Sequence, residues 1–173
     1  GGPVRPEYTR GRGAGGEGGT RPIATGERLV RRRGVLPALQ AGVGGAQPDL
    51  SDAGGISEVH RIASRGDTCE VAIAGRCPRG PIALGSSLQI GFATPNYLIQ
   101  EQSQGIHYNI GGELFDTVTN ADDFAFVDGY VNRLTKPGLG IEIDEAKVRA
   151  ADQVGHNWHP GWWRHEDGSF AEG

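Results

Sequence analysis

The stretch Gln47–Ile56, which reads QPDLSDAGGI, places an acidic side chain where a short apolar segment gives way to a glycine-rich loop. Charged residues follow the next two predicted strands in the same way, in Ala74–Ala83 (AGRCPRGPIA) and in Gln100–Gln102 (QEQ). In a (β/α)₈ barrel the catalytic groups sit where the strands run out into the βα loops, one or two per strand. The spacing of these segments therefore favours a barrel active site.

Apolar periodicity around these segments predicts alternating strands and helices. After the strand over residues 45–50, Ile56, Val59, Ile62 and Ala63 fall on one face of a helix. The rest of the alternation is a strand over 70–74, an apolar helix over 82–92 with small residues at 85–87, and a strand over 96–100. Strands alternating with helices at this spacing indicate an α/β fold with a parallel sheet.

The flanking segments are less regular. Arg21–Leu29 is a short strand candidate, and Val35–Leu39 is a weak helical fragment. On the other side, residues 124–143 are expected to be extended chain around the turn Lys136–Gly140, and Asp144 is expected to N-cap a short helix that ends near Ala151.

Composition limits the function classes. The chain has 173 residues, which predicts one domain, whereas a complete barrel with its helices needs roughly 250. The net charge of −4 and the absence of a basic face argue against nucleic acid as a partner and favour a small molecule or a protein. No apolar run approaches the ~20 residues of a membrane span, so the prediction is a soluble, cytoplasmic protein without membrane contact.

Cysteine and glycine usage add two expectations. Cys69 and Cys77 are too few for a disulfide scaffold and lack zinc-knuckle spacing, so both are predicted to be reduced and structural. The Gly/Arg-rich residues before position 46 bury little surface, so residues 1–46 are predicted to be poorly ordered in part.

Several longer segments resemble the sugar-acid dehydratases of the enolase superfamily (mandelate racemase/muconate lactonizing enzyme-like), most of all the D-galactonate dehydratases. The segments that carry the resemblance are Pro22–Leu29 (PIATGERL), Gln47–Ile56 (QPDLSDAGGI), Cys77–Leu84 (CPRGPIAL), Asn96–Asn109 (NYLIQEQSQGIHYN), Lys136–Lys147 (KPGLGIEIDEAK) and Trp163–Glu172 (WRHEDGSFAE). The resemblance covers most of the chain from Thr20 onward.

This resemblance implies a fold. The chain would be a partial (β/α)₈ TIM barrel, about strands five to eight, with residues 1–110 as the carboxyl-terminal half of the barrel. Residues 111–173 would be a C-terminal extension with an aromatic tail, and the amino-terminal capping domain would be absent. Such a half barrel would leave two open strand edges and an uncovered interior, so we expect poor stability.

The resemblance also implies a mechanism. Family members hold Mg²⁺ through three carboxylates, remove the proton next to the metal-bound substrate carboxylate, and release water to give a 2-keto-3-deoxy acid. By position, Glu27 matches the third metal ligand, Asp49 the carboxylate that orients a catalytic histidine, and Glu101 the glutamate that helps stabilise the intermediate. The alternatives are a solvated strand-end carboxylate for Glu27, a turn-forming aspartate for Asp49 and a surface glutamate for Glu101.

Two departures from the family pattern affect the expected activity. Arg76 stands where the family has histidine, and a guanidinium that is always charged cannot cycle a proton. The family's second metal ligand belongs to a Glu-Glu-Pro-Val segment, whereas the matching residues here are Gly1–Val4 (GGPV), and a single carboxylate holds Mg²⁺ poorly. The expectation is thus a D-galactonate dehydratase-like hydro-lyase acting on a sugar acid, inactive as this chain, and assembled as a homo-oligomer. The alternatives are a non-catalytic degenerate barrel remnant or another acid-sugar dehydratase.

The histidines of the chain do not form a recognised metal-binding pattern. His156, His159 and His165 lack the spacing of a metal site and have no carboxylate or cysteine partner in a recognised pattern. His107 could line the mouth of the active site, or it could serve in packing or in loop hydrogen bonding.

Overall fold

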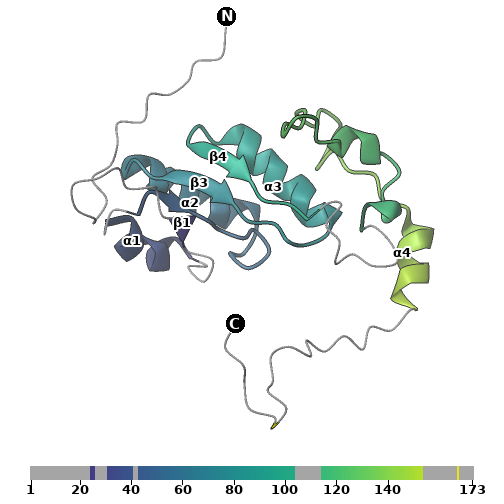
Figure 1. Cartoon of the computed structure of the whole chain (residues 1–173), viewed down its shortest axis with the longest axis horizontal. Coiled ribbons are helices and arrows are strands. Elements are labelled where there is room, and N and C mark those ends of the chain that lie inside the picture. Colours follow the sequence, from purple (N-terminus) through teal and green to yellow (C-terminus); the bar gives the residue numbers. More distant parts are fainter. Residues whose placement is uncertain (1–23, 26–30, 41–42, 104–113, 154–166, 168–173) are drawn as a thin grey trace, which may run out of the picture.

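Within the part of the chain that the structure describes, four short parallel strands form one sheet. Figure 1 shows this sheet with its helices. The computed structural model describes residues 24–25, 31–40, 43–103, 114–153 and 167. The strands lie side by side in chain order, as β1 (Ala24–Thr25), β2 (Gly45–Ala46), β3 (Ala72–Gly75) and β4 (Tyr97–Gln100). One helix lies between each pair of consecutive strands in the sequence: α1 (Arg32–Gln40), α2 (Ile56–Thr68) and α3 (Pro81–Ala93). The two βα units β2–α2 and β3–α3, the strand β4 and the parallel sheet predicted from the sequence are confirmed, and β1 and α1 fall within the strand candidate and at the helical fragment expected before them. The described sheet is open rather than closed into a barrel.

The first hydrophobic core lies between the sheet and the helices. In α2, Val59, Ile62, Ala63 and Gly66 are buried, at the three- and four-residue intervals of a single helix face. They pack with Ile73 of β3, which is fully buried. Ile56 was predicted to share this face but is 44% exposed, because it is the first residue of the helix and lies outside the packed turns.

The second core lies on the other side of α3. Proline at the first helical position costs α3 no hydrogen bond, since the first amides of a helix have no partner within it. The helix is buried around most of its circumference, so it contacts both the sheet and the chain that follows β4. The second core joins these parts through Cys77, Leu84, Leu88, Phe124 and Leu134.

Residues 114–144 follow an irregular path, and the part over 124–143, which was expected to be extended around the turn at 136–140, forms no helix beyond Phe124. They hold two short 3₁₀ helices, η1 (Leu114–Thr117) and η2 (Ala121–Phe124), and within this described range the strand pairing is limited to two isolated bridges. The Asn120 side chain explains the irregular path. Its amide nitrogen donates to the carbonyl of Gly140 at 2.9 Å, and its oxygen accepts from the amide of Glu142 at 2.8 Å. A side chain thus satisfies backbone groups that a strand partner would otherwise satisfy.

Helix α4 (Glu145–Asp152) begins as the sequence predicted. The Asp144 carboxylate accepts a hydrogen bond from the amide of Lys147 at 3.1 Å, which is the geometry of an N-cap. Among the described residues, none of the helices combines the length and the apolar character needed to span a bilayer.

Candidate active site

Asp49, Arg76 and Glu101 lie in one row at the carboxyl edge of the sheet. Asp49 and Arg76 are partners in an isolated parallel bridge beyond the ends of β2 and β3, and the Arg76 amide donates to the carbonyl of Pro48 at 3.1 Å. On the other side, the Glu101 amide donates to the carbonyl of Gly75 at 2.8 Å. The backbone ladder therefore continues past three adjacent strands, and it brings together the three residues that the sequence singled out here.

Asp49 is the buried member of this row, with 2% of its surface exposed. Its Oδ1 accepts a hydrogen bond from the Ser51 amide at 2.7 Å, and its carbonyl accepts from Ala53 at 2.8 Å. These bonds close the turn that leads into the glycine-rich loop. Asp49 therefore makes the contacts of a turn-forming aspartate, the alternative considered from the sequence, and it also lies beside Arg76 and Glu101 at the sheet edge. Oδ2 is buried and accepts no hydrogen bond from the described residues.

Two arginines supply the positive charge at this edge. Nε of Arg76 lies 3.6 Å from Oε2 of Glu101. Nε of Arg79 lies 3.6 Å from Oδ2 of Asp49, and its Nη2 lies 2.7 Å from Oδ1 of Asp52. Arg79, which pairs with Asp49, is not among the site residues predicted from the sequence. The signal available was a second arginine in the same loop, three residues after Arg76.

A hydrogen-bonded pair of side chains holds the ends of β3 and β4 together. Gln100 Nε2 donates to the carbonyl of Gly75 at 3.1 Å, and the Tyr97 hydroxyl donates to Gln100 Oε1 at 2.5 Å. Burial of the Tyr97 ring raises the pKa of its hydroxyl, which therefore remains a donor at all ordinary pH values. The backbone from which Arg76 and Glu101 project is fixed by these contacts.

Cys77 follows Arg76 and points into the second core. Its side chain is 1% exposed, and both described cysteines are free thiols, as predicted. Burial raises the pKa of the Cys77 thiol above its ordinary value. The residue is thus a packing group beside the row of charges rather than an activated nucleophile.

We expect Cys77 to react with iodoacetamide at least about tenfold more slowly than the half-buried Cys69 at pH 8, because a raised pKa and burial both lower the supply of accessible thiolate. Mass spectrometry of timed samples measures the two rates, and labelling in denaturant provides the control in which both thiols react. Raising the pH should speed the labelling of Cys77. Equal rates in the folded chain would contradict the buried placement.

The described residues do not form a magnesium site. None of them come together as a group of three or more His, Cys, Asp or Glu side chains able to hold a metal ion. Asp49 and Glu101 each lie beside a guanidinium, which competes with a cation for the carboxylate oxygens. Glu27, the predicted ligand, lies outside the described residues, as do His107, His156, His159 and His165.

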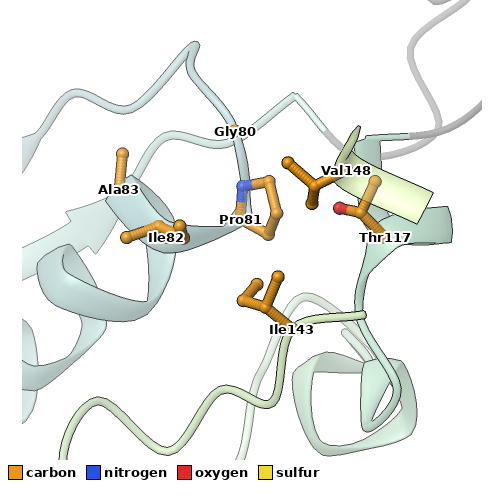
Figure 2. Close-up of a pocket in the computed structure, with 7 residues that line it drawn as sticks. All are labelled: Gly80, Pro81, Ile82, Ala83, Thr117, Ile143 and Val148. Carbon is orange, nitrogen blue, oxygen red and sulfur yellow. The ribbon is translucent and has the colours of Figure 1, made fainter. Parts of the chain in front are cut away.

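A separate cavity of about 220 Å³ lies where α3 meets η1 and α4 (Figure 2). It is lined by Gly80, Pro81, Ile82, Ala83, Thr117, Ile143 and Val148. This lining is almost entirely apolar and includes no titratable side chain and no member of the row Asp49, Arg76 and Glu101. The cavity therefore offers no chemistry for the candidate site.

A parallel sheet built from βα units, with charged side chains gathered at its carboxyl edge, is the arrangement of part of a (β/α) barrel enzyme. Residues 3–147 match the family model described as "Enolase C-terminal domain-like". The chain belongs to this family, the carboxyl-terminal domain of the enolase superfamily.

Solved structures agree with this family. A Salmonella enterica serovar Typhimurium protein provisionally assigned as a dehydratase is 28% identical, with a TM-score of 0.66 over 76% of this chain and 32% of that one. A mandelate racemase/muconate lactonizing enzyme from Jannaschia sp. CCS1 is 30% identical, with a TM-score of 0.65 over 75% of this chain and 31% of that one.

An Agrobacterium radiobacter enolase, provisionally assigned as a galactarate dehydratase and solved with sodium and L-malate, is 30% identical. Its TM-score is 0.65 over 85% of this chain and 39% of that one. The chain thus spans about a third of the length of the structures it matches.

Proposed function

We propose that the chain is the carboxyl-terminal barrel segment, about strands five to eight, of a sugar-acid dehydratase resembling D-galactonate dehydratase, with an altered site. The observation that carries the proposal is the row of Asp49, Arg76 and Glu101 at the carboxyl ends of three adjacent parallel strands. Catalytic groups of barrel enzymes occupy this edge. The similarity to proteins provisionally assigned as dehydratases supports the choice of reaction.

The roles proposed for the residues follow from their chemistry. Asp49 would orient the residue at position 76, since the two are bridge partners and Asp49 is an ionisable group held in a fixed turn. Glu101 would lie near the substrate carboxylate. Arg76 binds anions but cannot give and take a proton near neutral pH, so we expect no turnover from the chain as it stands.

Magnesium is part of the family chemistry, where it stabilises the negative charge that develops after proton removal. Glu27 is the residue of this chain proposed as a ligand. Since the described carboxylates do not fit a magnesium site, we assign no step of a reaction in this chain to the metal.

Two alternatives differ in what they predict. A non-catalytic barrel remnant is favoured by Arg76, whose guanidinium cannot cycle a proton near neutral pH. A dehydratase for another acid sugar is favoured by the similarity to the Agrobacterium radiobacter protein provisionally assigned to galactarate. Under the dehydratase proposals the ligand is a small sugar acid, the location is the cytoplasm, and assembly into homo-oligomers is expected, whereas a remnant would bind a sugar acid weakly, associate with intact subunits or have no function.

The test is a dehydration assay. The purified chain is incubated with Mg²⁺ and D-galactonate or galactarate, and the 2-keto-3-deoxy product is detected; we expect none. The chain is then joined to the amino-terminal part of the Agrobacterium radiobacter relative, once with Arg76 and once as Arg76→His. We expect product from the histidine version alone, because only imidazole can cycle a proton at that position.

Each contrary outcome has its own meaning. Product from the unmodified chain that is lost on Glu27→Gln would show that the site is completed in another way and that Arg76 does not prevent turnover. A folded histidine version that dehydrates neither acid, while the intact relative remains active under the same conditions, would contradict the dehydratase proposal.

A further inference from the structure

The Asp49 carboxylate lies in a place that water does not reach. Its side chain is 1% exposed and Oδ2 accepts no hydrogen bond from the described residues, while Oδ1 is engaged by the Ser51 amide. Burying a carboxylate without a counter-charge costs desolvation free energy, and a nearby cation is required to offset that cost. Among the residues that the structure describes, Oδ2 has an ion-pair partner in Arg79, whose Nε lies at 3.6 Å.

Arg79 also reaches a second carboxylate in the same loop as Asp49. Its Nη2 donates to Oδ1 of Asp52 at 2.7 Å, a short charge-assisted hydrogen bond. Asp49 and Asp52 belong to the loop between β2 and α2, whereas Arg79 belongs to the loop between β3 and α3. One guanidinium therefore joins the two loops that carry Asp49 and Arg76.

We infer that Arg79 is a positioning residue of the candidate site: by bridging Asp49 and Asp52 it fixes the buried Asp49 carboxylate beside position 76. The inference rests on the proposed function for the meaning of the site and goes beyond it by adding a residue that the family resemblance does not assign. Arg79 acts through Asp49 and needs no contact with substrate.

The test measures the Asp49 turn directly, without substrate. We compare the ¹H shift and the hydrogen-exchange rate of the Ser51 amide, which donates to Asp49 Oδ1, in the wild-type chain, Arg79→Leu and Arg79→Lys. In Arg79→Leu we expect a shifted ¹H signal of the Ser51 amide and about tenfold faster hydrogen exchange at that amide. The change should be smaller in Arg79→Lys, because lysine keeps the positive charge but lacks the planar guanidinium that contacts both Asp49 and Asp52.

Two further variants separate positioning from packing. Arg61→Leu is the matched control, since the Arg61 side chain is 56% exposed, close to the 52% of Arg79, and pairs with Glu58 at 3.5 Å; it should leave the Ser51 amide unchanged. In an Asp49→Asn background, Arg79→Leu should add nothing, because the charge on which Arg79 acts is gone. An unchanged Ser51 amide in Arg79→Leu, or an equal effect of Arg79→Leu in the Asp49→Asn background, would overturn the inference.

A second measurement covers the case in which Arg79→Leu fails to fold. The Nε–Hε signal of Arg79 itself is followed in the wild-type chain and in Asp49→Asn, and we expect faster exchange in the variant. An identical signal in both would also overturn the inference. Neither measurement depends on dehydration, so a failed activity assay would leave this inference standing, and a failure here would leave the activity assay valid.

Discussion

Substituting Gly75 by alanine is expected to destabilise the folded chain by about 3 kcal/mol, the upper end of the usual cost of overpacking a core. A Cβ at this position would lie 1.7 Å from the Tyr97 hydroxyl oxygen and 2.7 Å from its Cζ. The ring cannot simply move aside. On its other side it is packed against α3, where a Cβ at Gly91 would lie only 3.1 Å from Tyr97 Cε1.

Urea unfolding of the wild-type chain and of Gly75→Ala measures this effect. Gly34→Ala is the control, because Gly34 lies within α1 with nothing within 4 Å of the added methyl group. It should be neutral or stabilising by up to about 1 kcal/mol, since alanine is the better helix former. Combining Gly75→Ala with Tyr97→Leu should recover part of the loss by removing the clashing ring. A Gly75→Ala variant as stable as the wild type would show that Tyr97 does not lie against β3 as described.

The sequence predicted the units β2–α2 and β3–α3 and the strand β4 because the helices and strands of the first core bury apolar side chains at regular intervals. The row of Asp49, Arg76 and Glu101 could be predicted for a related reason: residues that follow parallel strands meet at one edge whatever the details of packing. Glu27 was predicted as a metal ligand from the family resemblance and lies outside the described residues, so its role stays a prediction.

Other features depend on contacts between segments far apart in the chain, and they could not be predicted. The pairing of Arg79 with Asp49 joins residues 30 positions apart, and nothing in the spacing distinguishes Arg79 from Arg76 as the partner. The two 3₁₀ helices before residue 125 were not predicted, and the Asn120 side chain between them is bonded to Gly140 and Glu142, 20 and 22 positions away. The predicted domain boundary at residue 110 likewise stays a prediction.

Phe124→Ala is the second substitution for which we expect a large effect, a loss of about 3–5 kcal/mol, typical of removing a buried aromatic ring. Phe124 is fully buried and packs edge-to-face on Phe115, with ring centroids 5.3 Å apart. It also faces α3, where its Cε1 would lie 3.6 Å from a Cβ at Gly85. The ring therefore connects the chain after β4 to a helix of the barrel segment, in a core that also holds Cys77.

Phe92→Ala is the matched control, because the same ring at 46% exposure should cost less than about 1 kcal/mol when it is removed. Urea unfolding gives the two losses, and hydrogen exchange of the Leu84 and Leu88 amides shows where the effect is felt. If the second core is shared, Phe124→Ala should speed exchange in α3 as well as in residues 114–153, because both sides lose the same packing partner. Faster exchange confined to residues 114–153, with α3 unchanged, would instead show that this segment folds as a unit of its own and that the barrel segment does not depend on it.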